Sequence, residues 1–499
     1  MTTTAISSSM VNELKLAAID AWMRGQSPKF LGQFFIKDGS YCQIGGGVSI
    51  LVDRPTSGES GGGSGTQSQT TSIPGYTNTQ VSEVDYSAQF DAVRATVDSL
   101  LDPWLKLPDP SEISKLVEHC RTVTSRLSRN AWSDGGGNHR GAGVAIDSCL
   151  REIEVDSGDF KGLTAREFRL KFLYYIPSVI ENHLSLTLTR GGAMYGQQLL
   201  WEAVRRDVVA LVKKSTEAMN VIAGSGADGL EHTFEAMGMV LDGVKLFVPG
   251  GVGKAIDLGK LGLTAAKNAL PEKATLSAED YESAIEQLSS ALQTLSDHVS
   301  AEESLAQKAV QNHAEVTQSP DTREGYDIDS PVLPADSIVG IDAEKLSGLA
   351  NTTLPALALE LNEIADLNQK CSSPDAVFRH FSIGLGSYGP SDALWQANTY
   401  IHSLIEEVAG DVLDGSVQLG LVLSDFAETE ADIIHRLNDY LAGIDEVTSD
   451  RPSGSPLDSY PVVPTRPPLL PEAPISTPAS PFFDFSKMMS GPASEAEQS

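Results

Sequence analysis

The residues that come nearest to a phosphate-binding loop are three glycines and a lysine, Gly250, Gly251, Gly253 and Lys254. A P-loop requires a glycine five residues before the glycine of its Gly-Lys pair, and a serine or threonine directly after the lysine. Here Val248 stands at the first of these positions, and an alanine follows the lysine. Both requirements fail, so the segment is predicted to be a turn between helices.

The cysteines and histidines show no spacing that would hold a metal ion or build a nucleophilic centre. The four cysteines are scattered and none forms a Cys-x-x-Cys pair, so neither a zinc site nor a disulfide framework is indicated. Cys120 and Cys371 fall on apolar helical positions and are predicted to be small buried thiols. The nine histidines lack the His-Glu-x-x-His pattern. We therefore expect no catalytic residue, no metal and no cofactor.

The composition narrows the classes of partner. The chain has 499 residues and carries 36 Lys and Arg against 67 Asp and Glu, a net charge of −31. Such a chain repels phosphate backbones and anionic membrane surfaces, so we expect no nucleic-acid partner. No apolar run is long enough to span a bilayer. The N-terminal region lacks the basic and apolar segments of a general secretory signal, so export would need another route.

Clusters of Gly, Ser and Pro divide the chain into helical blocks and linkers. The predicted fold is all-α, with two helical-hairpin or bundle modules joined by flexible linkers. The predicted segments are a short N-terminal segment 1–43, a Gly/Ser/Thr-rich linker 44–80, a helical bundle 81–313, an acidic linker 314–340, a helical hairpin 341–446 and a disordered Pro-rich tail 447–499.

The first block begins with a clear helical pattern. Phe90, Val93, Val97 and Leu100 recur with a period of 3.6 residues, and Pro103 is expected to end that helix. The next helix has a start signature, in which Asp109 caps, Pro110 fills the first turn and Glu112 completes a capping box. Its apolar face is predicted to consist of Ile113, Leu116, Cys120, Val123 and Leu127.

A long amphipathic helix is predicted over 277–312, beginning at Ser277. Its apolar residues follow a narrow heptad stripe, as in the seam of a coiled coil. The helix could pack on the first bundle or pair with another chain. If it pairs with a second copy of this chain, the protein is a homo-oligomer through 277–310. The stripe consists of Tyr281, Ile285, Leu288, Leu292, Leu295 and Val299.

The segment from Asp159 to Phe168 resembles the turn of the WXG superfamily of small helical hairpins. In that family an aromatic-x-Gly turn leads into a helix that begins with alanine and an aromatic residue. Here Phe160 stands where the family has Trp, and Gly162 matches the family's glycine. Glycine permits the tight turn, and the aromatic ring closes the open end between two helices. The Gly-rich stretch that precedes it departs from the compact family hairpin.

The second block, 341–446, resembles the EspC-type proteins, which belong with the WXG superfamily to the type VII (ESX) export system. Near its end, Phe426 and Glu430 resemble the Tyr-x-x-x-Asp/Glu signal of type VII (ESX) secretion substrates, with Phe in place of Tyr. Residues four apart share one helix face, so the ring and the carboxylate would be presented together. The alternative interpretation is that Phe426 continues the helix core and Glu430 is solvated.

The two resemblances imply a type VII secretion substrate or structural component that acts by protein–protein interaction without catalysis. They imply the secretion machinery or a WXG-type helical protein as partner, and a secreted or cell-surface location reached by a non-classical route. The alternative hypothesis is a cytoplasmic scaffold that self-associates through its long amphipathic helix.

Overall fold

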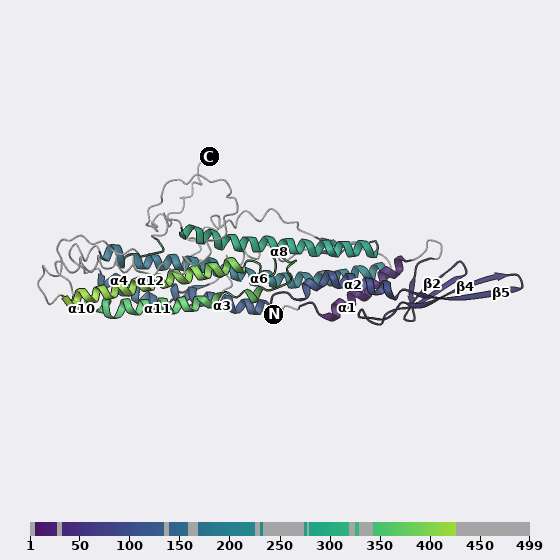
Figure 1. The fold of residues 1–499 in the computed structure, drawn as a ribbon, viewed down its shortest axis with the longest axis horizontal. Coiled ribbons are helices and arrows are strands. Elements are labelled where there is room, and N and C mark those ends of the chain that lie inside the picture. Colours follow the sequence, from purple (N-terminus) through teal and green to yellow (C-terminus); the bar gives the residue numbers. More distant parts are fainter. Residues whose placement is uncertain are drawn as a thin grey trace, which may run out of the picture.

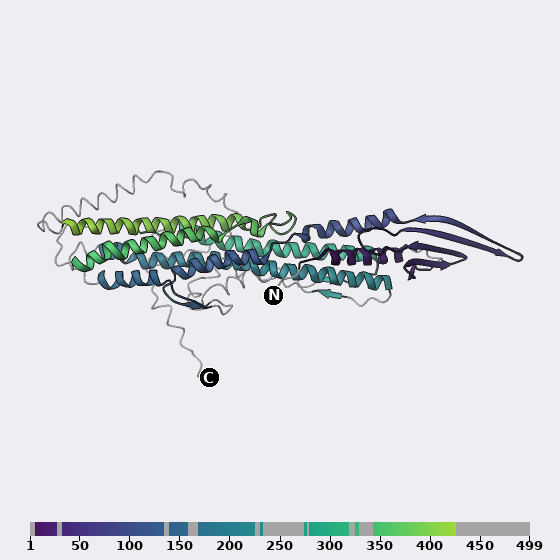
Figure 2. The same ribbon diagram turned by 90° about the horizontal axis from the view of Figure 1, so that it is seen from below.

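The computed structural model describes the chain in nine stretches, 5–26, 32–133, 139–157, 168–224, 230–232, 274–276, 279–318, 325–328 and 343–425. They form an elongated molecule in which long helices lie side by side and a β-sheet extends from one end (Figures 1 and 2). None of the helices in these stretches is long and apolar enough to cross a membrane.

A five-stranded antiparallel sheet corrects the prediction of an all-α fold. The strands follow one another in sheet order, and β5 and β1 are the two edges. The predicted linker 44–80 is therefore largely strand, and the predicted N-terminal segment 1–43 supplies a helix and the beginning of the sheet. The strands are β1 (Phe35–Lys37), β2 (Ser40–Gly45), β3 (Val48–Asp53), β4 (Ser64–Ile73) and β5 (Tyr76–Asp85).

Helices make up most of the other residues that the structure describes. They are α1 (Ser8–Gly25), α2 (Ser87–Leu105), α3 (Pro110–Leu127), α4 (Val144–Asp156), α6 (Tyr175–Gly224), α8 (Tyr281–Gln318), α10 (Ala343–Gly348), α11 (Leu354–Asn368) and α12 (Ser391–Asp425). Short π- and 3₁₀-helical turns are η2 (Arg169–Leu173), η4 (Leu349–Thr353), η5 (Gln369–Cys371) and η6 (Pro374–Val377). Two small strand pairs join β6 (Trp132–Ser133) to β7 (His139–Arg140) and β8 (Leu230–His232) to β9 (Ala274–Leu276).

Helix α6 is the axis of the molecule. It has 50 residues, which at the rise of an α-helix corresponds to about 75 Å. Helices α1, α3 and α8 all pack against it. Gly191 and Gly192 are buried inside this one continuous helix. Packing against these helices stabilises α6 where its two glycines would weaken it in isolation.

The start of α3 agrees with the sequence in part. Asp109 caps the helix by accepting a hydrogen bond from the backbone N–H of Ser111 at 2.9 Å, and Pro110 is the first residue. The proposed capping box does not form in this conformation, because the carboxylate of Glu112 accepts from Lys115 at 2.7 Å. Pro103 lies inside α2 and does not end it, since that helix continues for two further residues.

The heptad seam of α8 is already covered within the chain. Leu288, Leu292, Leu295 and Val299 are buried in the common core, and α8 packs along α6. The seam is therefore unavailable to a second chain unless α8 leaves the bundle. Of the two placements that the sequence left open, the structure shows the intramolecular one.

The two predicted modules share one hydrophobic core. Helix α11 packs on α3 and α4, and α12 packs on α6 and α8. Arg126 of α3 donates to both carboxylate oxygens of Glu360 on α11 at 2.7 Å, so a bidentate ion pair also crosses the boundary. The prediction of separate modules is wrong, because helices from both blocks bury their apolar faces on each other.

Candidate interaction site

The residues singled out by the resemblance lie outside the described part of the chain. This applies to Phe160 and Gly162 of the hairpin turn and to Phe426 and Glu430 of the export signal. The glycine-rich loop 250–254 and the tail 447–499 lie outside it as well. These assignments therefore stay predictions.

The described residues contain no group of three or more His, Cys, Asp or Glu side chains that could hold a metal ion. One Gly-x-Ser-x-Gly pattern occurs, from Gly58 to Gly62 with Ser60 at its centre. In an α/β-hydrolase this pattern forms a strained turn between a strand and a helix. Here it lies between β3 and β4 of an antiparallel sheet, and Ser60 is exposed, so the pattern does not build a nucleophile elbow.

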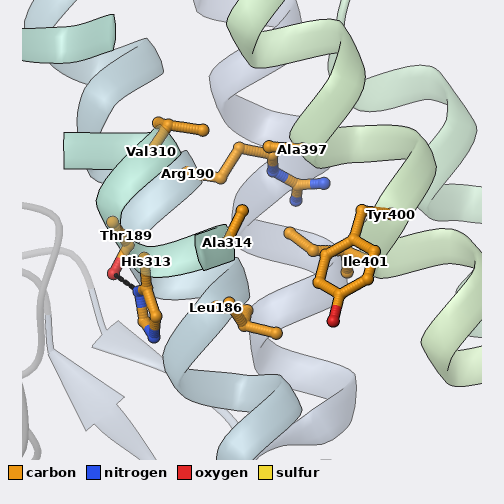
Figure 3. Close-up of a pocket in the computed structure, with 9 residues that line it drawn as sticks. All are labelled: Leu186, Thr189, Arg190, Val310, His313, Ala314, Ala397, Tyr400 and Ile401. Atoms are coloured by element: carbon orange, nitrogen blue, oxygen red, sulfur yellow. Dashed lines mark hydrogen bonds between the residues drawn. The ribbon is translucent and has the colours of Figure 1, made fainter. Parts of the chain in front are cut away.

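A small cavity between α6, α8 and α12 is lined by polar and apolar side chains, among them Thr189, Arg190, His313 and Tyr400 (Figure 3). Its volume is about 10 Å³, at the lower limit of the space that one water molecule needs. Nδ1 of His313 lies 2.7 Å from the hydroxyl of Thr189. Burial lowers the pKa of His313 to about 4, so the ring is neutral at pH 7. The cavity is too small to bind a substrate.

A two-stranded ribbon projects from the sheet. β4 pairs with β5 over ten residues, from Ser64 opposite Asp85 to Ile73 opposite Tyr76. β3 covers only the first part of β4, from Gly65 to Gln69, so the remainder of the ribbon has no third strand. Almost all of its side chains are exposed on both faces, and the ribbon extends beyond the ends of the helices (Figures 1 and 2).

The ribbon has an unusual composition for this chain. Between Ser60 and Ser82 there is no charged residue, although the whole protein has a net charge of −31. Ser, Thr, Gln and Asn dominate, and hydroxyls pair across the strands, with Thr70 and Thr79 at 3.2 Å. Three larger apolar side chains are exposed, Ile73, Tyr76 and Val81.

Strand β5 is an open edge. No other strand lies on its outer side among the residues that the structure describes. Half of the backbone N–H and C=O groups of an antiparallel edge strand point away from its neighbour and remain available for hydrogen bonds. Many proteins protect such edges with lysine, proline or a bulge. β5 contains neither lysine nor proline, and its only charges are Glu83 and Asp85 at the base.

The base of the ribbon is held firmly. Asp20 of α1 is buried, and its carboxylate accepts from the hydroxyl of Tyr41 on β2 at 2.6 Å and from Nε and Nη2 of Arg54 at 2.8 and 2.6 Å. Arg94 of α2 donates to the carbonyls of Gly58 and Gly61 at 3.1 and 2.6 Å. These contacts fix the sheet and the loop between β3 and β4 on α1 and α2.

The electrostatic environment strengthens the contacts of Asp20 with Tyr41 and Arg54, which we call the anchor of the ribbon. Burial, the charge of Asp20 and the hydrogen bond to Asp20 raise the pKa of Tyr41 far above its usual value. The hydrogen bond to Asp20 likewise raises the pKa of Arg54. Tyr41 is therefore neutral and Arg54 is charged at pH 7, as the hydrogen bonds to Asp20 require.

Sequence reasoning missed this site. The ribbon's polar residues do not alternate with apolar ones, since neither face is buried, and such stretches are easily taken for linkers. One signal was present, a Pro-Gly dipeptide at Pro74–Gly75 between two runs rich in β-branched Thr. Gly75 has a φ of +88°, which the tight turn between β4 and β5 requires.

Comparison with known proteins yields no relative. No protein family, no curated protein and no solved structure matches this chain.

Proposed function

We propose that the protein acts by binding other protein chains and not by catalysis, with the β4–β5 ribbon as the contact site. The observation that carries the proposal is the open edge of β5, which is uncharged from Tyr76 to Ser82 and is presented at the end of a long helical bundle. An edge strand binds an extended segment of a second chain through backbone hydrogen bonds, which give affinity without requiring a pocket.

The partner that the sequence favours at the edge of β5 is a second copy of this protein. Two molecules with a net charge of −31 repel each other over most of their surfaces. The ribbon lacks charge from Ser60 to Ser82, so two copies meet there with the least repulsion. Antiparallel pairing of β5 with β5 about a two-fold axis is self-complementary, because each strand offers the other the same groups.

The anchoring of the ribbon favours this role. Asp20, Arg54 and Arg94 hold its base on α1 and α2, so little conformational entropy is lost when the edge binds. Tyr76 at the tip adds exposed apolar area next to the backbone groups. A dimer formed in this way would place two helical bundles at opposite ends of a shared ribbon.

Sedimentation velocity of the full chain over a range of concentrations tests the contact. We expect a dimer whose affinity falls at least about tenfold when lysines replace Thr77 and Thr79, since charge at the edge opposes strand pairing. The matched control replaces Ala92 and Ala95, which are exposed on α2, with lysines and should leave the affinity unchanged. A wild-type protein that is monomeric at every concentration would contradict the proposal.

We further propose that the chain is exported as a type VII secretion substrate or structural component, as its resemblance to those proteins suggests. Replacing Phe426 and Glu430 with alanine should then abolish export in a host that carries the secretion machinery. Circular dichroism of the same variant should show unchanged helicity. Normal export of the double variant would refute this assignment and leave the ribbon proposal untouched.

A further inference from the structure

Two thiols that are far apart in the sequence are neighbours in the core. Cys120 lies on α3 and Cys371 lies in η5, directly after α11. Sγ of Cys120 donates to the carbonyl oxygen of Cys371 at 3.8 Å, across 251 positions of the chain. Both side chains are fully buried, and the two segments pack against each other.

A buried cation lies beside this pair. Arg190 of α6 is 1% exposed, and its Nη1 donates to the amide oxygens of Asn368 and, at 2.5 Å, of Asn398. Both of these acceptors are neutral. Nε and Nη2 of Arg190 have no hydrogen-bond partner among the described residues. A cation in such surroundings favours the formation of an anion next to it.

The surroundings shift the pKa values of the two thiols in opposite directions. The contact with Cys371 and the positive charge of Arg190 lower the pKa of Cys120, against the effect of its burial. Burial and the hydrogen bond with Cys120 raise the pKa of Cys371. In the docked core Cys120 is therefore the thiol that ionises more readily, and a thiolate is the nucleophile in thiol–disulfide exchange.

We propose that Cys120 and Cys371 form a redox-active pair, which closes to a disulfide in the presence of a small-molecule disulfide such as oxidised glutathione. While η5 is undocked from α3, Cys371 loses its proton, attacks one sulfur of the reagent, forms a mixed disulfide and releases one glutathione thiolate. When η5 docks again, Cys120 loses its proton, its thiolate attacks the sulfur of Cys371 and the second glutathione leaves as a thiolate. The protein loses two protons and two electrons, and the reagent is reduced to two thiols.

The bond would connect two parts of the chain that are distant in sequence. It would tie α3 covalently to the end of α11, in addition to the Arg126–Glu360 ion pair that joins the same two helices. Because neither thiol is exposed in the packed bundle, exchange requires the η5 segment to be undocked from α3. The reaction therefore runs during folding or local opening, and the closed bundle then shields the bond from reductants.

The test is to unfold the full chain under reducing conditions and refold it with an excess of oxidised glutathione. Peptide mapping of the refolded wild type should show one linked peptide pair, joining Cys120 to Cys371, and the intact mass should fall by two hydrogen atoms. The oxidised protein should unfold at a higher temperature than the reduced protein, and dithiothreitol under unfolding conditions should reverse the shift.

The other two cysteines provide matched controls, since Cys42 and Cys149 are also buried. C42S and C149S should form the bond in the same yield as the wild type, whereas C120S and C371S should not form it. The wild-type peptide map decides the question even if a serine variant folds poorly. Absence of the Cys120–Cys371 peptide, or equal yields of links to Cys42 or Cys149, would overturn the proposal.

Discussion

Arg379 and Glu303 form an ion pair in which neither side chain has any exposed surface. Nη2 of Arg379 donates to both carboxylate oxygens of Glu303, to Oε1 at 2.6 Å. The same guanidinium lies over the ring of Trp201, 4.9 Å from its centroid. Glu303 belongs to α8, Trp201 to α6 and Arg379 to the turn that precedes α12. One pair of charges therefore joins three segments of the bundle.

Replacing Arg379 with Met should destabilise the protein by about 3–5 kcal/mol, because the buried carboxylate of Glu303 would lose its opposite charge. The double variant R379M/E303L removes both charges and should recover most of that loss. Urea denaturation followed by circular dichroism measures both. Equal destabilisation in the single and double variants would contradict this explanation.

The stability of the protein should depend on the protonation of Glu303. Burial raises the pKa of Glu303 from 4.5 to about 7, although Arg379 opposes the shift. A carboxyl whose pKa is raised by folding stabilises the native state fully below pH 4.5, and this contribution is lost as the pH rises through about 7. Denaturant midpoints measured across this range should show a decline that is absent in E303Q.

Two glycines of the turn before α12 are needed to enclose the ion pair. Gly384 and Gly389 have φ values of +63° and +52°, and a Cβ at either would lie 2.4–2.5 Å from a carboxylate oxygen of Glu303. Gly386 has a φ of +94°, but the nearest atom to its Cβ would be 4.0 Å away. G384A and G389A should each cost roughly 2–4 kcal/mol, and G386A only about 1–2 kcal/mol. Thermal denaturation of the three variants gives the comparison, and equal losses would show that only the backbone conformation matters.

Lowering the pH should destabilise the protein because His313 becomes protonated. Its pKa is lowered from 6.5 to about 4 by burial, so folding favours the neutral ring. This contribution to stability is present above pH 6.5 and is lost as the pH falls towards 4. The total loss in the free energy of unfolding is up to roughly 3 kcal/mol. H313Q keeps a partner for Thr189 and should lose part of the acid sensitivity. The control H380Q replaces an exposed histidine and should retain the acid sensitivity that H313Q loses.

The side chain of Asp109, which caps the start of α3, should contribute about 1 kcal/mol to the free energy of unfolding. Asp109 accepts from the N–H of Ser111, and that hydrogen bond lowers the pKa of the carboxyl. A carboxyl with a lowered pKa stabilises the native state above pH 3.8, and this contribution is lost as the pH falls below that value. D109A should therefore destabilise the protein at pH 7, while D109N, which can still accept, should cost much less. Similar losses in both variants would indicate a role for the charge of Asp109 instead of its hydrogen bond.

The helices could be predicted from the sequence because each buries one face in a common core. Ile113, Leu116, Cys120, Val123 and Leu127 were predicted as the apolar face of one helix, and all five are buried in α3. The heptad stripe of α8 was likewise recognised, and its middle part is buried. A period of 3.6 residues survives in the sequence wherever a helix has water on one side and core on the other.

The sheet and the candidate site could not be predicted in this way. β4 and β5 form a ribbon with water on both faces, so no apolar alternation marks them, and cross-strand hydrogen bonds stabilise them instead. The division of the bundle into two modules failed for a different reason. Contacts such as Arg126 with Glu360 join residues 234 positions apart, and no local pattern encodes a pairing over that distance.

The turn at Pro74–Gly75 offers a use that is independent of the natural partner. Nothing lies within 4 Å of a Cβ placed at Gly75, and the turn is at the far end of a ribbon whose base is fixed on α1 and α2. A foreign peptide grafted into this turn would be displayed clear of the bundle, where loops accept insertions most readily. With α6 setting its length, the protein would serve as a stiff carrier that holds an epitope or a label at a known distance from its opposite end.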